Sequence, residues 1–181
     1  MAKELIKTPL AEVRWAKLLA PQKQYDETKP LAWSCELLLP NDSKETQRFL
    51  LEMEDKLTEL HGTTAKKSVH AFPWGPDKEK PKEFTVVKFK LPQFTRRDGT
   101  VSEGPVIYDS RKNAWDGKEI GNGSKILVGF DIYAWSGAAG VGMTFQPRAV
   151  MVVDLVEYER GKPDEIFETV EGGYVNSEVP F

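Results

Sequence analysis

Two adjacent strand-like stretches between residues 121 and 158 constrain the fold of this chain more than any other part of it. From Lys125 to Trp135 apolar residues recur at every second position, which is the periodicity of a half-buried strand. The face that this alternation predicts to be buried carries Ile126, Val128, Phe130, Ile132 and Ala134. A second, valine-rich strand is predicted over residues 143–158, and the sequence SGAAGVG between the two is typical of a hairpin connection. Because proline lacks an amide donor, Pro147 predicts a bulge or an edge position near the start of the second strand.

Four further strands are predicted from similar alternation, over residues 10–19, 31–39, 84–91 and 105–108. In the first of these, the pattern places Val13, Trp15 and Leu19 on one face. In the second, Cys35 falls among large apolar residues, which favours a small core residue over a nucleophile. We therefore expect a mainly β protein.

One helix is predicted, over residues 42–60, between the second and third strands. Asp42 or Ser43 can cap its N-terminus, and Gly62 is well placed to end it. The apolar stripe of this helix, which we expect to pack on the core, consists of Phe49, Leu50, Met53, Leu57 and Leu60.

The composition is that of a globular protein, with 40% hydrophobic and 29% charged residues in 181. No apolar run reaches the roughly 18 residues that a membrane-spanning helix needs, and the N-terminus lacks the apolar core of a signal peptide. A single cysteine and two histidines make a zinc site improbable and indicate a reducing compartment. We expect a cytoplasmic protein without metal or other cofactor.

The charge is unevenly distributed along the chain. Residues 164–181 carry five acidic and no basic residues, which leaves 23 acidic against 25 basic residues in the rest. We expect a folded domain over residues 1–158 and a flexible acidic tail over 159–181, because few apolar side chains there could offset the entropy of ordering. A mildly basic body with an acidic tail fits a polyanion binder that carries its own competitor, although a merely solubilising tail gives the same count.

Aromatic rings lie among lysines and arginines in the long loops and on the outer faces of two strands. This combination suits single-stranded nucleic acid, since rings stack on bases while cations meet phosphates. The rings predicted to contact DNA are Trp74, Phe94, Trp115, Tyr133 and Trp135. The cations predicted to contact DNA are Lys66, Lys67, Lys88, Lys90, Arg96, Arg97, Arg111, Lys112 and Lys125. In the alternative interpretation, Phe72 and Trp74 plug the end of a barrel and the lysines are simply solvated.

No catalytic constellation is present in the sequence. It contains neither a P-loop nor a GxSxG motif, and its acidic residues show no paired spacing. The glycine-rich segments precede strands rather than a helix, which does not fit a dinucleotide fingerprint. We therefore predict a protein that is not an enzyme.

The segments IGNGSKILVGFDIYAW and GVGMTFQPRAVMVVDLVEY resemble the closing strand pair of phage single-stranded DNA-binding proteins of the podovirus replication type. The segment FTVVKFKLPQFTRRDGT and the tail that ends in Pro180–Phe181 are also similar to that family. The resemblance implies an OB-fold, here a five-stranded barrel with one helix and long basic and aromatic loops. It further implies binding of single-stranded DNA without sequence specificity, in phage DNA replication, recombination and repair, in the infected bacterial cell.

In that family the acidic tail with its terminal aromatic residue contacts replication proteins, such as polymerase or helicase-primase, and competes with DNA. The corresponding residues here are Asp164, Glu165, Glu168, Glu171, Glu178 and Phe181. A homodimer is possible. Two alternatives remain open, namely a small metal-dependent nuclease or nucleotide hydrolase of the same replication module, and a structural or assembly protein.

Overall fold

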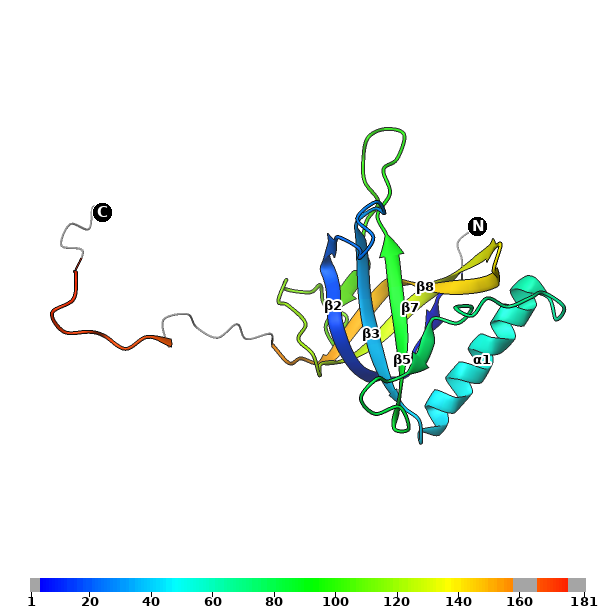
Figure 1. The fold of residues 1–181 in the computed structure, drawn as a ribbon, viewed down its shortest axis with the longest axis horizontal. Helices are drawn as coiled ribbons and strands as arrows, with labels where there is room; N and C mark the ends of the chain where they lie inside the picture. The colour runs from blue at the N-terminus through cyan, green and yellow to red at the C-terminus, as the bar shows by residue number, and fades with distance from the viewer. Residues whose placement is uncertain (1–3, 158–165, 176–181) are drawn as a thin grey trace.

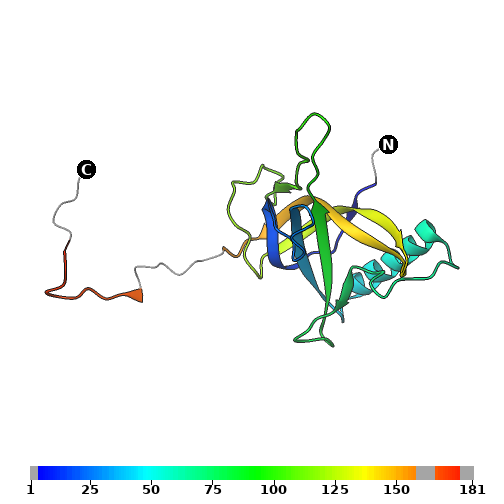
Figure 2. The ribbon, with the colours of Figure 1, turned by 45° about the horizontal axis from the view of Figure 1, so that its top comes forward.

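The computed structural model describes residues 4–157 and 166–175 (Figures 1 and 2). Within these residues the chain forms one helix and eight strands. All eight strands belong to one sheet. In chain order the elements are β1 (Ile6–Lys7), β2 (Ala11–Gln22), β3 (Ala32–Pro40), α1 (Lys44–His61), β4 (Trp74–Pro76), β5 (Phe84–Pro92), β6 (Val106–Tyr108), β7 (Lys125–Gly137) and β8 (Gly140–Asp154).

Five of the strands close into a barrel. β2 pairs with β3, β3 with β5, β5 with β8, β8 with β7, and β7 pairs back with β2. The contact that closes β5 against β8 is short and parallel, at Phe89 and Phe145. Strands β1, β4 and β6 add to the outside of this ring on β7, β5 and β8. The predicted OB-fold-like five-stranded barrel is thus confirmed, and closure removes most free strand edges.

A cluster of phenylalanine rings fills the barrel. Phe130 lies 4.4 Å from Phe145 and 5.4 Å from Phe89, measured between ring centroids. All three are essentially inaccessible to solvent. Phe49 of α1 meets Phe130 edge-on at 6.1 Å, so the helix packs its apolar stripe against the same core. Leu60 was predicted to join that stripe and does not, because it is 48% exposed near the end of the helix.

Helix α1 connects β3 to the β4–β5 pair, so the predicted placement of the helix between the second and third barrel strands is confirmed. Ser43 occupies the N-cap position but makes no side-chain capping bond. Gly62 ends the helix as predicted, with φ of +84° and its N–H donating to the carbonyl of Thr58. A positive φ of this kind favours glycine because it has no Cβ.

Strands β7 and β8 form the long hairpin that the alternation predicts, with Ile126, Val128 and Phe130 fully buried. The predicted face was wrong toward the end of β7, where Ile132 is half-buried and Ala134 is exposed. The register shifts between Gly129, which pairs with Ala149, and Phe130, which pairs with Pro147. The bulge that Pro147 predicts is therefore present, with Arg148 as the extra residue.

The prediction for β2 was wrong in one respect that matters for the site. Trp15 was placed on the same face as the buried Val13, yet it is 61% exposed. The pairing of β2 with β3 shifts between Arg14 and Lys17, and Trp15 in this bulge has φ of +53°. The bulge reverses the inward–outward pattern, so that Leu18 is buried and Leu19 is exposed.

Cys35 lies in the core as predicted, and burial raises the pKa of its thiol to about 12. In the part of the chain that the structure describes, no helix is long and apolar enough to cross a membrane.

Candidate nucleic-acid interface

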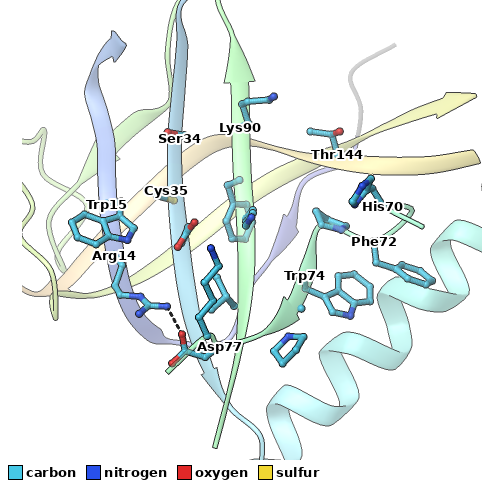
Figure 3. A pocket seen from close by; sticks show the side chains of 18 of the residues that line it. Arg14, Trp15, Ser34, Cys35, His70, Phe72, Trp74, Asp77, Lys90 and Thr144 are labelled. Carbon is cyan, nitrogen blue, oxygen red and sulfur yellow. Dashed lines mark hydrogen bonds and ion pairs between the residues drawn. The ribbon is translucent and has the colours of Figure 1, made fainter. Parts of the chain in front are cut away.

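A groove of about 880 Å³ lies on the outer face of the barrel, across β2, β3 and β5 (Figure 3). One wall is the segment over residues 69–79, which contains β4. This wall is fixed to β5 by strand pairing from Trp74 to Pro76 and by a bond from the Lys88 N–H to the Pro73 carbonyl. This wall of the groove is therefore held to the barrel by backbone pairing.

Four aromatic side chains line the groove without being fully buried, namely Trp15, Phe72, Trp74 and Trp135. Phe72 and Trp74 stack on one another at 4.7 Å. Trp135, from β7, lies over Gly142, where any Cβ would collide with the indole ring. Glycine at this position leaves room for the indole ring against β8.

Trp15 stands on the opposite rim of the groove, on β2 (Figure 3). A positive φ is unfavourable for a bulky side chain and is typically retained where the surroundings enforce it. Here the Trp15 N–H donates to Oδ1 of Asn122 at 2.9 Å, which satisfies the amide that the bulge removes from the ladder. The result is a large exposed ring on a stretch of backbone that a distant loop supports.

The cations of the groove are partly offset by carboxylates. Its basic residues are Arg14, Lys17, Lys78, Lys88 and Lys90, and its acidic residues are Glu36, Asp77 and Glu79. Arg14 donates from Nη2 to Oδ1 of Asp77 at 2.9 Å, and this bond holds the pKa of the Asp77 carboxyl below its usual range. The ion pair ties the segment after β4 to β2 across the groove (Figure 3).

The groove brings together four of the residues predicted from sequence, Trp74, Lys88, Lys90 and Trp135. Three others lie beside it. Lys66 and Lys67 precede the wall segment, with the Lys67 Nζ 5.5 Å from the Phe72 ring. Tyr133 lies two residues before Trp135 on the same face of β7 and is 50% exposed.

The remaining predicted residues lie outside the groove. Phe94, Arg96 and Arg97 are on the exposed loop after β5, where Arg96 lies over the Phe94 ring at 5.8 Å. Lys125 begins β7, at the opposite end of that strand from Trp135. Arg111 and Lys112 belong to a turn that Asp109 organises by accepting the Arg111 N–H.

Trp115 also lies apart from the groove. It is half-buried against the hydrophobic core, and its Nε1–H donates to the carbonyl of Lys118 at 2.8 Å. Phe72 and Trp74 pack on the hydrophobic core and line the groove at the same time.

Sequence reasoning missed the contribution of β2, which supplies Arg14, Trp15 and Lys17 to the groove. A signal for the bulge was available in the spacing of Val13 and Leu18. These two apolar residues are five positions apart, so they can face the core together only if the strand contains an extra residue between them.

In the tail, Glu168 and Glu171 are exposed, whereas Asp164, Glu165, Glu178 and Phe181 lie outside the described residues. Within residues 4–157 and 166–175, no group of three or more His, Cys, Asp or Glu side chains could hold a metal ion.

The fold is the one seen in solved structures of phage single-stranded DNA-binding proteins. The structure of gp2.5, a single-stranded DNA-binding protein encoded by bacteriophage T7, matches with a TM-score of 0.70 and 23% identity, over 97% of this chain and all of that one. The single-stranded DNA-binding protein of bacteriophage Enc34, in complex with single-stranded DNA, matches with a TM-score of 0.63 and 14% identity, over 84% of this chain and 88% of that one.

A sequence relative is the single-stranded DNA-binding protein of Enterobacteria phage T3, 38% identical over 77 residues. The match covers 40% of this chain and only 33% of the length of that relative. No protein-family model matches the chain.

Proposed function

We propose that this chain is a phage-type single-stranded DNA-binding protein, which binds the strand in the groove across β2, β3 and β5 without sequence specificity. The observation that carries the proposal is the groove itself, in which four accessible rings face a barrel surface with five cations. Rings can stack on any base, since every base has a π-face, and cations meet the phosphates that every nucleotide shares.

The comparisons support the same conclusion independently. A relative by sequence and two structural neighbours are all single-stranded DNA-binding proteins of phages, and one neighbour was solved with single-stranded DNA. We therefore assign the chain to phage DNA replication, recombination and repair in the cytoplasm of the infected bacterial cell, with no catalytic activity of its own.

The partners that we propose besides DNA are replication proteins, such as polymerase and helicase-primase, recruited by the acidic tail. A homodimer belongs to the same proposal. Tethering gives the tail a high effective concentration near the groove, so it can also compete with DNA.

The decisive experiment is a titration of labelled oligo-dT and of duplex DNA at several salt concentrations. Single-stranded DNA should bind much more tightly, because a duplex hides the base faces from the rings. The logarithm of the affinity should fall linearly with the logarithm of salt, by about 0.7 for each phosphate neutralised. Equal affinity for both forms would contradict the proposal, loss of DNA binding at low salt would favour an assembly protein, and metal-dependent cleavage would indicate a nuclease.

A further inference from the structure

A second hollow of about 370 Å³ adjoins the groove beneath the loop that connects β2 to β3. The residues that we call the loop basin are Lys17, Lys23, Gln24, Tyr25, Lys29 and Lys90. Lys17 pairs with Ser34 across β2 and β3, and Ser34 pairs with Lys90 across β3 and β5. These three residues line both hollows and form a row across the strands. A strand that leaves the groove over this row enters the loop basin directly.

The charge of the loop basin differs from that of the groove. The five cations of the groove face three carboxylates, whereas the four lysines of the basin face only Asp26 among the residues that line it. Oδ1 of Asp26 accepts two hydrogen bonds from Thr28, at 3.1 Å from its N–H and 2.6 Å from its hydroxyl, and these lower the pKa of the Asp26 carboxyl. The positive charge of Lys29 also lowers the pKa of this carboxyl, so Asp26 stays ionised and offsets one of the four lysines of the basin.

Lys90 is a lysine of the basin whose pKa is shifted by its surroundings. Burial, followed by repulsion from the positive charge of Lys29, lowers the pKa of the Lys90 ammonium. Its Nζ donates to Oε1 of Gln24 at 3.1 Å, and the Gln24 amide donates in turn to the carbonyl of Pro30 at 2.8 Å. The lysine is thus held in place by the loop while it is desolvated beside a like charge. An anion bound between the two lysines would relieve this repulsion.

The tip of the loop adds a ring to these cations. The side chain of Tyr25 is completely exposed and lines the basin beside Lys23. An exposed ring next to lysines is the arrangement that binds a base and its phosphate together.

We propose that the loop basin is a phosphate-binding subsite for the part of the DNA strand that leaves the groove. Lys29 and Lys90 hold a backbone phosphate, and Tyr25 stacks on a neighbouring base. The inference rests on the proposed function and adds to it a phosphate contact outside the groove, in a basin where four lysines face one carboxylate.

The test uses the full chain and a series of oligo-dT from about 4 to about 16 nucleotides, the range of site sizes known for one OB-fold. Lys29→Gln should weaken binding of the longer oligomers several-fold and lower their salt slope by about 0.7, while oligomers that fill only the groove bind as before. Lys44→Gln is the matched control, because Lys44 is an exposed lysine at the start of α1 and lines neither hollow. An unchanged salt slope for Lys29→Gln on the longest oligomers would overturn the inference.

A second measurement uses the wild-type protein and a single long oligomer. Lysines of the wild-type protein are acetylated with and without a long oligo-dT, and the modified positions are read by mass spectrometry. Lys23 and Lys29 should be protected by DNA, and Lys44 should not. Reaction of Lys23 and Lys29 at the same rate with and without DNA would overturn the inference even if the oligomer binds. Failure of oligo-dT to bind at all would instead refute the proposed function.

Discussion

The backbone N–H of Trp15 donates to the side-chain oxygen of Asn122 at 2.9 Å, joining two residues that are 107 positions apart. This bond supports a bulge in which a bulky residue has φ of +53° and its ring stands 61% exposed at the rim of the groove. Such a residue contributes little to the core. Its conformation is understandable if the ring binds something outside the protein.

Trp15→Ala is therefore expected to weaken oligo-dT binding by about 5- to 150-fold, because stacking on one ring contributes about 1–3 kcal/mol per base. Leu51→Ala, which removes a similarly exposed side chain from α1, should leave the affinity unchanged. Fluorescence anisotropy of labelled oligo-dT measures both. Equal affinity of Trp15→Ala and wild type would exclude this ring from the interface.

Trp15→Gly separates conformation from binding. Because glycine tolerates a positive φ and alanine does not, the glycine variant should unfold with a free energy about 1 kcal/mol higher than the alanine variant. Both variants should lose the same DNA affinity. Urea denaturation of the two variants gives the comparison, and a less stable glycine variant would show that the bulge is not strained.

Phe130→Ala tests the centre of the barrel. The ring is fully buried against Phe89 and Phe145, so the substitution should lower the free energy of unfolding by about 3–5 kcal/mol. Chemical denaturation followed by circular dichroism is the appropriate measurement. A loss below about 1 kcal/mol would mean that the barrel interior is not packed as described.

The thiol of Cys35 should be inert in the folded protein. Its pKa of about 12 lies above the ordinary value of 9.0, so the native thiol stays protonated at pH values where an unfolded chain ionises. The contribution of this group to stability is complete below pH 9.0 and decreases as pH rises toward 12. A thiol reagent at pH 8 should react only after denaturant is added. Rapid reaction of the native protein would contradict the burial of this residue.

Truncation of residues 164–181 removes five acidic side chains and is expected to tighten DNA binding at low salt. The gain should shrink as salt rises, because screening weakens a tethered competitor. Phe181→Ala should leave DNA affinity nearly intact while abolishing capture of a phage or host replication protein. If the truncated protein binds DNA more weakly at low salt, the competitor role of the tail is wrong.

Alternation and helical spacing were sufficient to predict the barrel strands and the helix, since burial of one face dictates both patterns. Ile126, Val128 and Phe130 were assigned to the buried face directly from the sequence, and all three are fully buried. The exact position of the bulge at Trp15 could not be assigned, because the hydrogen bond that supports it comes from Asn122 in a distant loop.

The sequence predicted the type of ligand, but it predicted only some of the residues that line the groove. Rings among lysines indicated nucleic acid, yet only the fold shows that Trp74 and Trp135 meet in one groove. Trp115 has the same sequence surroundings, but its indole N–H is bonded within its own loop and its ring packs on the core.

The central claim is that DNA bases stack in the groove across β2, β3 and β5. Of the five tryptophans, three line this groove, Trp33 is buried, and Trp115 lies elsewhere. The most direct measurement is the quenching of tryptophan fluorescence by oligo-dT in the wild type and in a variant with Trp15, Trp74 and Trp135 all replaced by phenylalanine. Strong quenching in the wild type and almost none in the variant is the predicted result. Equal fractional quenching in both proteins would show that the bases bind near Trp115 and not in the groove.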